Sequence, residues 1–206
     1  SGKSTFIRCL NKLILPSNGD ILINNKSYNN LTRQHICSNV ATIFQNFNLV
    51  PRLSVLSNVL IGRLSYLKGI RRVLGIFSEN DKEHALQALE KIGIINYAFK
   101  NVKSLSGGQQ QRVAIARAVS GEPQILLADE PIANLDPKNA IMVLELLRDL
   151  NKKNNVTIIV NLHQIELANK YFDRVIGFRE GSIVHDSKVH GEFSNKHYEE
   201  IYKDEE

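Results

Sequence analysis

The sequence predicts an α/β fold in which helices cover both faces of a parallel sheet. In the second half of the chain, apolar runs of strand length alternate with helical segments, which is typical of this architecture. From residue 51 to about residue 118 the pattern turns largely helical, which predicts a helical subdomain inserted into the sheet-forming sequence. The chain has 206 residues, 43% of them hydrophobic and 23% charged, as expected for one globular domain spanning residues 1–206.

Local signals place the individual elements. A helix over residues 3–13 is closed by the turn residues Pro16-Ser17-Asn18-Gly19. Ser78 and Asp81 form a capping box for a helix through Leu89. Asp136 and Pro137 fit the N-cap and first position of another helix. The predicted strands are 20–24, 40–44, 124–129, 156–161 and 174–178, and the other predicted helices are 109–119, 137–150, 164–171 and a peripheral one within 188–206.

Charge and cysteine content narrow the class of protein. The formal net charge is +5, but the basic residues are scattered and Arg71-Arg72 is the only adjacent arginine pair, so we expect no nucleic-acid partner. Apolar runs such as residues 125–128 have strand length, and we expect neither a membrane span nor a signal peptide. Cys9 and Cys37 lack metal-ligand spacing, which favours a reducing compartment.

The chain opens with Ser1-Gly2-Lys3-Ser4-Thr5, which fits the end of a phosphate-binding loop of the form G-x-x-x-x-G-K-[ST]. Glycine allows backbone N–H groups at a helix N-terminus to approach phosphates closely. Lys3 would reach the β- and γ-phosphates, Ser4 would ligate Mg²⁺, and Thr5 would lie near the α-phosphate. A Gly-Lys-Ser run also occurs by chance, so this half-motif is weak alone. Since such a loop normally follows a strand, we expect the natural protein to begin upstream.

Two acidic residues follow the apolar run of residues 125–128. Asp129 and Glu130 would stand at the end of a buried strand, where Asp129 would hold Mg²⁺ and Glu130 would polarise the attacking water. Acidic pairs at exposed turns are common, but together with the upstream Gly-Lys-Ser run this pair predicts a nucleotide site.

The run Leu105-Ser106-Gly107-Gly108-Gln109 opens a predicted helix and creates a second anion site at a helix N-terminus. This site lies too far along the chain to belong to the first loop. It therefore predicts contact with the γ-phosphate of a nucleotide held by a second copy of the chain.

The L-S-G-G-Q run resembles the signature of ABC transporter ATPases, and further motifs of that family follow in order. The resemblance implies a P-loop NTPase fold that binds ATP and Mg²⁺. Gln45 matches the Q-loop glutamine, which contacts Mg²⁺ or water, and His163 matches the switch histidine that contacts the γ-phosphate. Residues 133–136 resemble the D-loop, which makes Asp136 a candidate nucleotide-site residue. The sequence departs from the family at Asn134, and the adenine-stacking aromatic that the resemblance implies is expected upstream of Ser1, outside the given sequence.

The segments between the motifs resemble the ATP-binding subunits of phosphonate importers. The resemblance lies in residues 56–63, residues 71–77 and the V-N-L-H-Q run of residues 160–164. A polar amino-acid importer and a non-transport ATPase of a phosphonate-degrading complex remain alternatives. A soluble ABC ATPase acting on DNA or ribosomes is disfavoured, because only 60 residues separate Gln45 from Ser106 and they show no heptad pattern.

As an importer subunit, the chain is expected to form a homodimer on the cytoplasmic face of the membrane. The resemblance implies two membrane-spanning permease subunits and an extracytoplasmic substrate-binding protein as partners. We expect residues 45–77 to dock on the permease, with Phe47 and Leu49 exposed for that contact.

Overall fold

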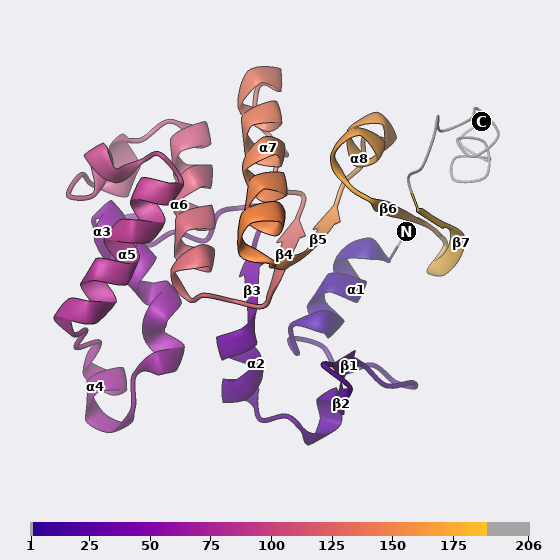
Figure 1. The fold of residues 1–206 in the computed structure, drawn as a ribbon, viewed down its shortest axis with the longest axis horizontal. Helices are drawn as coiled ribbons and strands as arrows, with labels where there is room; N and C mark the ends of the chain where they lie inside the picture. The colour runs from indigo at the N-terminus through magenta and orange to yellow at the C-terminus, as the bar shows by residue number, and fades with distance from the viewer. Residues whose placement is uncertain (1, 189–206) are drawn as a thin grey trace.

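The computed structural model describes residues 2–188. Their helices pack around a three-stranded sheet (Figure 1). The strands β3 (Val40–Ile43), β4 (Ile125–Asp129) and β5 (Thr157–Asn161) lie in the order β3-β4-β5, and both pairs are parallel. The predicted α/β architecture with a parallel core is therefore confirmed. The peripheral helix predicted within 188–206 falls, from residue 189 onward, outside the described residues.

The central strand β4 shows that helices cover both faces of this sheet. Successive side chains of a strand point to opposite faces. Leu126 and Ala128 are fully buried in the main core, which they share with α6 (Gly107–Ser120) and α7 (Pro137–Asn154). Leu127 is fully buried in a second cluster, together with residues of α1 (Lys3–Leu10) and α2 (Arg33–Asn39). The alternation within one strand thus divides the core into two layers.

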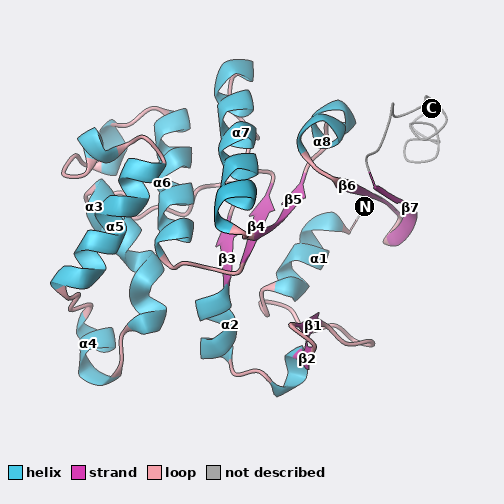
Figure 2. Ribbon diagram, in the orientation of Figure 1, coloured by secondary structure: helices cyan, strands magenta, loops and turns pink. Residues whose placement is uncertain are grey.

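Between β3 and β4 the chain forms helices and loops only, as Figure 2 shows. Their apolar faces meet in the main core, where Val59, Leu89 and Val113 are fully buried. The helices of this region besides α6 are α3 (Val55–Leu60), α4 (Gly69–Leu74) and α5 (Glu79–Lys91), with 3-10 turns at Ile61–Tyr66, Ile95–Tyr97 and Val102–Ser104.

Helix starts follow the predicted caps. Asp136 caps α7 by accepting from the backbone N–H of Asn139, and Pro137 is the first helical residue. The Ser78–Asp81 capping box opens α5 with both of its reciprocal hydrogen bonds. The sequence analysis missed α2, which Thr32 caps.

The predicted strand at 174–178 does not join the parallel sheet. It forms β6 (Arg174–Arg179), which follows α8 (Ile165–Tyr171) and pairs antiparallel with β7 (Ser182–Lys188). Glu180 and Gly181 take left-handed backbone angles, with φ of 48° and 80°, and this tight turn returns the chain beside β6. The alternating pattern of helices and strands could not show this reversal.

The first third of the chain also differs from the prediction. The strand predicted at 20–24 is reduced to β1 (Leu22–Ile23), which pairs antiparallel with β2 (Lys26–Ser27) across a left-handed Asn24-Asn25 turn. Helix α1 ends at Leu10 rather than at residue 13, because Lys12 turns left-handed, with φ 59°.

The loop after β3 is more buried than predicted. Phe47 and Leu49 are half-buried, and Leu49 packs against the main core. The Arg117 guanidinium of α6 donates to the carbonyl oxygens of Phe47 and Asn48 at 2.7 and 2.6 Å. The prediction that Phe47 and Leu49 are exposed is therefore wrong, because a half-buried arginine from a distant part of the chain holds this loop. Large exposed apolar residues lie instead on α4, at Ile70, Val73 and Leu74.

A buried ion pair joins the helices of the inserted region. Arg63 and Asp81 are 4% and 6% exposed, and their side chains meet at 3.0 Å. Arg63 also donates to the carbonyl oxygen of Ser120, at the end of α6. Burial alone would raise the pKa of Asp81, but hydrogen bonds from Ser78 and Arg63, together with the Arg63 charge, lower it to about 2. The carboxylate is therefore stabilised in its ionised form.

Replacing Asp81 with asparagine is expected to destabilise the fold by about 3–5 kcal/mol, because buried Arg63 would keep only the longer 3.5 Å pair with the exposed Glu122. The lowered pKa contributes about 2 kcal/mol, which is present above about pH 4 and lost as pH falls through the folded-state pKa. Urea unfolding of the wild type and of Asp81→Asn should show a difference in the free energy of unfolding at neutral pH. This difference should become smaller as the pH is lowered. The control is Asp149→Asn, which breaks an exposed ion pair with Lys153. If both variants lost the same amount of stability, the Arg63–Asp81 pair would not have the stabilising role assigned to it.

Candidate functional site

The parallel sheet brings the predicted site residues to one edge. The carboxyl ends of parallel strands meet on the same side, where loops can collect polar groups. Gln45 follows β3, Asp129 and Glu130 close β4, and His163 follows β5. Helix α1, which begins after Gly2, contacts β4 and β5. Four segments that are distant in sequence therefore meet at this edge.

A hydroxyl, a carboxylate and an amide converge at the end of β4. The Ser4 Oγ donates to Asp129 Oδ1 at 3.0 Å. Asn161 Nδ2 donates to the same carboxylate oxygen at 2.7 Å and to Ser4 Oγ at 3.3 Å. Ser4 and Asp129 together present hard oxygen atoms, which are the ligands that Mg²⁺ prefers. Within residues 2–188, no cluster of three or more histidine, cysteine or acidic side chains is arranged for metal binding, so a cation here would rely on this mixed set.

Glu130 is held by partners from both neighbouring strands. Gln45 Nε2 donates to its Oε2 at 2.9 Å, and His163 Nε2 lies 2.8 Å from its Oε1. The Glu130 backbone is left-handed, with φ 50°, an uncommon conformation for a residue with a long side chain. Its N–H donates to the carbonyl oxygen of Asn161 at 3.2 Å. The carboxylate is therefore fixed at the sheet edge, where it can accept a proton from a water molecule.

The N-terminus of α1 faces the same edge. Gly2 caps the helix in a left-handed conformation, with φ 90°, and contributes no side-chain cap. Lys3 is half-buried in the first turn, and Thr5 is exposed there. This turn contains no acidic residue, so its amides and its lysine provide a positive environment for phosphate.

The second predicted set lies at the start of α6. Ser106 and Gln109 form a capping box, in which Gln109 Oε1 accepts from the Ser106 N–H at 2.9 Å. Ser106 and Gly107 are exposed, whereas Gly108 is buried. A Cβ atom on Gly108 would lie 2.8 Å from the side chain of Asn139 on α7, so any larger residue there would displace Asn139. The start of α6 is thus packed against the start of α7 and leaves Ser106 open to a partner.

Asp136 serves locally as the cap of α7. Its carboxylate accepts hydrogen bonds from the Asn139 side chain and backbone, which lower the pKa of Asp136. Asn134, which departs from the family pattern, has φ 63°, a conformation that asparagine tolerates well. No contact joins Asp136 directly to Ser4, Asp129 or Glu130 among the hydrogen bonds of the described residues.

Two polar residues at the site were not singled out from the sequence. Asn161 is 5% exposed and lies opposite Asp129 in the register of β4 and β5. A polar residue that ends an apolar strand beside Asp129 is a signal that could have identified it. Gln111 of α6 is fully buried, and its Nε2 donates to the Pro131 carbonyl oxygen at 2.6 Å. The sequence pattern gives no sign of this second contact.

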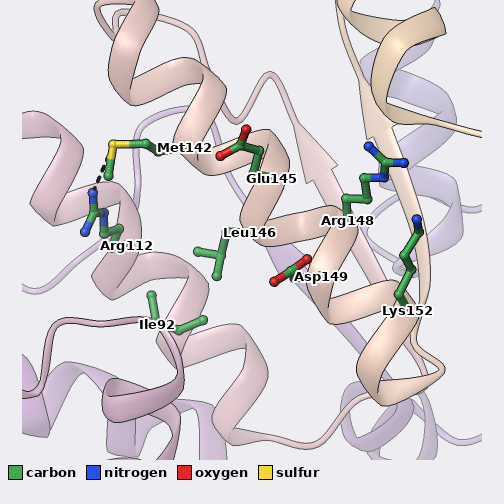
Figure 3. Close-up of a pocket in the computed structure, with 8 residues that line it drawn as sticks. All are labelled: Ile92, Arg112, Met142, Glu145, Leu146, Arg148, Asp149 and Lys152. Atoms are coloured by element: carbon green, nitrogen blue, oxygen red, sulfur yellow. Dashed lines mark hydrogen bonds between the residues drawn. The ribbon is translucent and has the colours of Figure 1, made fainter.

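A groove elsewhere on the molecule lacks the character of a nucleotide site. It has a volume of about 510 Å³ and lies between α6 and α7, near the end of α5 (Figure 3). Basic and acidic side chains alternate around an apolar floor, and no glycine-rich helix start lines it. It is lined by Ile92, Arg112, Met142, Glu145, Leu146, Arg148, Asp149 and Lys152.

Comparison with known proteins decides the family. The family model described as ABC transporter matches residues 1–133. The chain belongs to the ABC transporter family. ATP is the nucleotide that this family binds and hydrolyses.

Relatives within the ABC transporter family are similar over most of the chain. The chain is 40% identical to phosphonates import ATP-binding protein PhnC 2 of Oceanobacillus iheyensis, over 98% of this chain and 80% of the relative. It is 47% identical to phosphonates import ATP-binding protein PhnC of Rhizobium meliloti, over 91% of this chain and 68% of the relative.

Solved ABC structures share the fold. One is the dimeric, post-hydrolysis ATP-binding cassette MJ0796 bound to ADP and Pi, with a TM-score of 0.76 and 33% identity over 92% of this chain and 82% of that chain. Another is cbiO1 of Clostridium perfringens, part of the ABC transporter complex cbiONQ, with a TM-score of 0.78 and 31% identity over 91% of this chain and 73% of that chain. Among the described residues, none of the helices is both long enough and apolar enough to cross a bilayer.

Proposed function

We propose that this chain is the ATP-hydrolysing subunit of an ABC importer for phosphonates. The observation that supports ATP hydrolysis best is that Gln45 and His163 hold the Glu130 carboxylate beside the Ser4–Asp129 pair. The names of the relatives at 40% and 47% identity support phosphonate as the cargo. Nothing in the site touches a transported molecule, so the cargo rests on those relatives.

The nucleotide would lie across the start of α1. The backbone at Gly2 and the amine of Lys3 would bind the phosphates, and the Thr5 hydroxyl would lie near the α-phosphate. Ser4, Asp129 and Gln45 supply oxygen donors for Mg²⁺, which would neutralise charge on the β- and γ-phosphates. Their oxygen chemistry fits that cation.

Hydrolysis would use the residues at the ends of β4 and β5. Glu130 would accept a proton from the attacking water, since its carboxylate is already oriented by two partners. His163, which is mostly exposed and borders Glu130, would contact the γ-phosphate. Gln45 reaches the same carboxylate and could sense whether the nucleotide is bound.

A second copy of the chain would complete each site. Helix α6 begins with an exposed cap, which is suited to an anion bound by a partner subunit. The residues at this helix start are Ser106, Gly107, Gly108 and Gln109. Asp136 would lie at the same interface, close to the start of α7. MJ0796, a related cassette of known structure, is dimeric. This arrangement gives a homodimer with two nucleotides.

The importer would also contain two membrane-spanning permease subunits and an extracytoplasmic binding protein, with this subunit on the cytoplasmic face. Residues 51–118 would form the helical subdomain that meets the permease. The exposed apolar residues of α4 are suited to such a contact, because this helix has no buried residue of its own.

A strain that lacks this protein is expected to lose phosphonate uptake, and the wild-type gene should restore it. Uptake of labelled phosphonate and of polar amino acids measures the cargo directly. If the strain loses amino-acid uptake but takes up phosphonate normally, the cargo is a polar amino acid and the phosphonate assignment is wrong. If phosphonate entered normally but was no longer degraded, the transport role itself would be wrong.

A further inference from the structure

The start of α6 and the turn that carries Glu130 are joined by a buried side chain. Gln111 lies on α6 just over one helical turn after the Ser106 cap and is 0% exposed. Its Nε2 donates to the carbonyl oxygen of Pro131 at 2.6 Å. Pro131 directly follows Glu130. One hydrogen bond therefore connects the helix that begins at Ser106 with the residue next to Glu130.

The chemistry of Pro131 gives this bond particular weight. Proline has no backbone N–H, so its carbonyl is the only backbone hydrogen-bonding group that it offers. Pro131 is buried, and leaving that carbonyl without a partner would be costly. On the other side of the contact, Gln111 Oε1 is buried and has no hydrogen-bond partner among the described residues. Among the described residues, the bond to Pro131 is therefore the one hydrogen bond that orients the Gln111 amide.

The turn at residues 130–135 is held at two points on either side of Glu130. Upstream, the Glu130 N–H donates to the carbonyl oxygen of Asn161 on β5, at 3.2 Å. Downstream, Gln111 holds Pro131 from α6. Glu130 itself is in the left-handed region, which the surroundings must stabilise. Releasing the downstream point would let the backbone relax and shift the carboxylate away from Gln45 and His163.

Helix α6 is well suited to fix this point. Its residues Val113, Ala114, Ile115 and Ala116 are fully buried, so the helix cannot move without disturbing the main core. Its N-terminus is capped by Ser106 and packed against α7 through Gly108. A displacement of this helix start would therefore be transmitted through Gln111 to the Pro131 carbonyl.

We propose that Gln111 is a positioning residue, which fixes the Glu130 carboxylate relative to the helix that begins at Ser106. The proposal rests on the proposed function, because it assumes that Glu130 acts on the attacking water. It adds a direct structural link between the surface offered to a partner subunit and the carboxylate of the chain's own site. Gln111 would act through Glu130 and would not touch the nucleotide.

Gln111→Met in the full-length protein removes the donor while keeping the length and apolar bulk of the side chain. We expect kcat for ATP hydrolysis to fall roughly 10- to 100-fold, because small misplacements of a reacting group have effects of this size. KM for ATP, ATP affinity and ATP-dependent dimerisation should stay near wild type, since the phosphate and dimer contacts are untouched. The melting temperature should fall by only about 2–4 °C, because the Pro131 carbonyl loses its donor while methionine also removes the unpaired Oε1.

Gln110→Met is the matched control. Gln110 is the neighbouring glutamine, and its Nε2 donates to the carbonyl oxygens of Leu105 and Val102 without reaching the turn after β4. Its kcat should stay within about twofold of wild type, as expected for contacts outside the reacting groups. If Gln111→Met does not fold, Gln111→Leu serves the same purpose.

The proposal would be overturned by a wild-type kcat in a folded Gln111 variant. A loss of ATP affinity that parallels the loss of kcat, or a melting temperature lowered by much more than about 4 °C, would also overturn it, because either would indicate a purely structural role. The Glu130→Gln variant shows whether the positioning role of Gln111 is wrong or the proposed function itself is wrong. If Glu130→Gln is inactive and Gln111→Met is fully active, only the positioning role is wrong; if Glu130→Gln is active, the assumed role of Glu130 is wrong.

Discussion

Glu130→Gln is expected to slow ATP hydrolysis by about 10²- to 10⁴-fold, the usual contribution of a positioned general base. Glutamine keeps the shape of the side chain, and its carbonyl oxygen can still accept from Gln45 Nε2. The substitution therefore removes basicity with little change in packing. Phosphate release and nucleotide affinity should be measured together, and affinity for ATP should be retained.

Glu145→Gln provides the control for this substitution. Glu145 is an exposed residue on α7 that lines the groove of Figure 3, and the same change there should leave turnover unaffected. Turnover of Glu130→Gln near the wild-type rate would remove Glu130 from the base role. The variant also traps the ATP-bound state, so light scattering should detect a dimer when ATP is added. A monomer under these conditions would exclude the completion of each site by a second copy.

Lys3→Ala is expected to weaken ATP binding by roughly 10- to 100-fold, since a charge-assisted hydrogen bond contributes about 1.5–3 kcal/mol. The ammonium group lies in the first turn of α1, where the glycine cap and the absence of acidic residues favour an anion. Turnover should fall as well, because less nucleotide is bound. Calorimetry on the full-length protein measures the affinity directly.

Lys91→Ala removes an equal charge from the exposed end of α5 and is the matched control. It should leave the ATP affinity unchanged, because α5 packs in the main core on one face of the sheet, whereas α1 packs in the second cluster on the other face (Figure 1). An unaltered affinity in Lys3→Ala would show that this lysine does not bind the phosphates.

The three strands of the central sheet could be predicted from the sequence, because they depend on local signals. The apolar run before Asp129 identifies a buried strand, and the direction of a parallel strand decides where its last residue lies. Capping signals at Ser78 and Asp136 are likewise local, since the hydrogen bonds that they make span only three residues.

The missed features depend on contacts that are distant in sequence. Arg117 reaches back 70 residues to hold the carbonyl of Phe47, which explains why that loop is less exposed than predicted. The Gln111–Pro131 bond spans 20 residues and joins helix α6 to the turn after β4. Arg174 pairs with Asp186 across the β6–β7 hairpin, and neither residue shows that the chain reverses there. Composition and periodicity contain no information on such pairings.

The contact between Asn161 and Asp129 has a consequence for how the sheet is aligned. Strand β5 is apolar on both faces, with Ile158 and Val160 against the main core and Ile159 against the second cluster. A strand of this kind could slip by one residue and still bury similar apolar area. A slipped strand would place Val160 or Leu162 beside Asp129, and the half-buried carboxylate would lose the amide from which it accepts a hydrogen bond. The polar contacts of the site therefore favour one alignment of β5 over its nearest competitors, so the site residues help to select the fold that positions them.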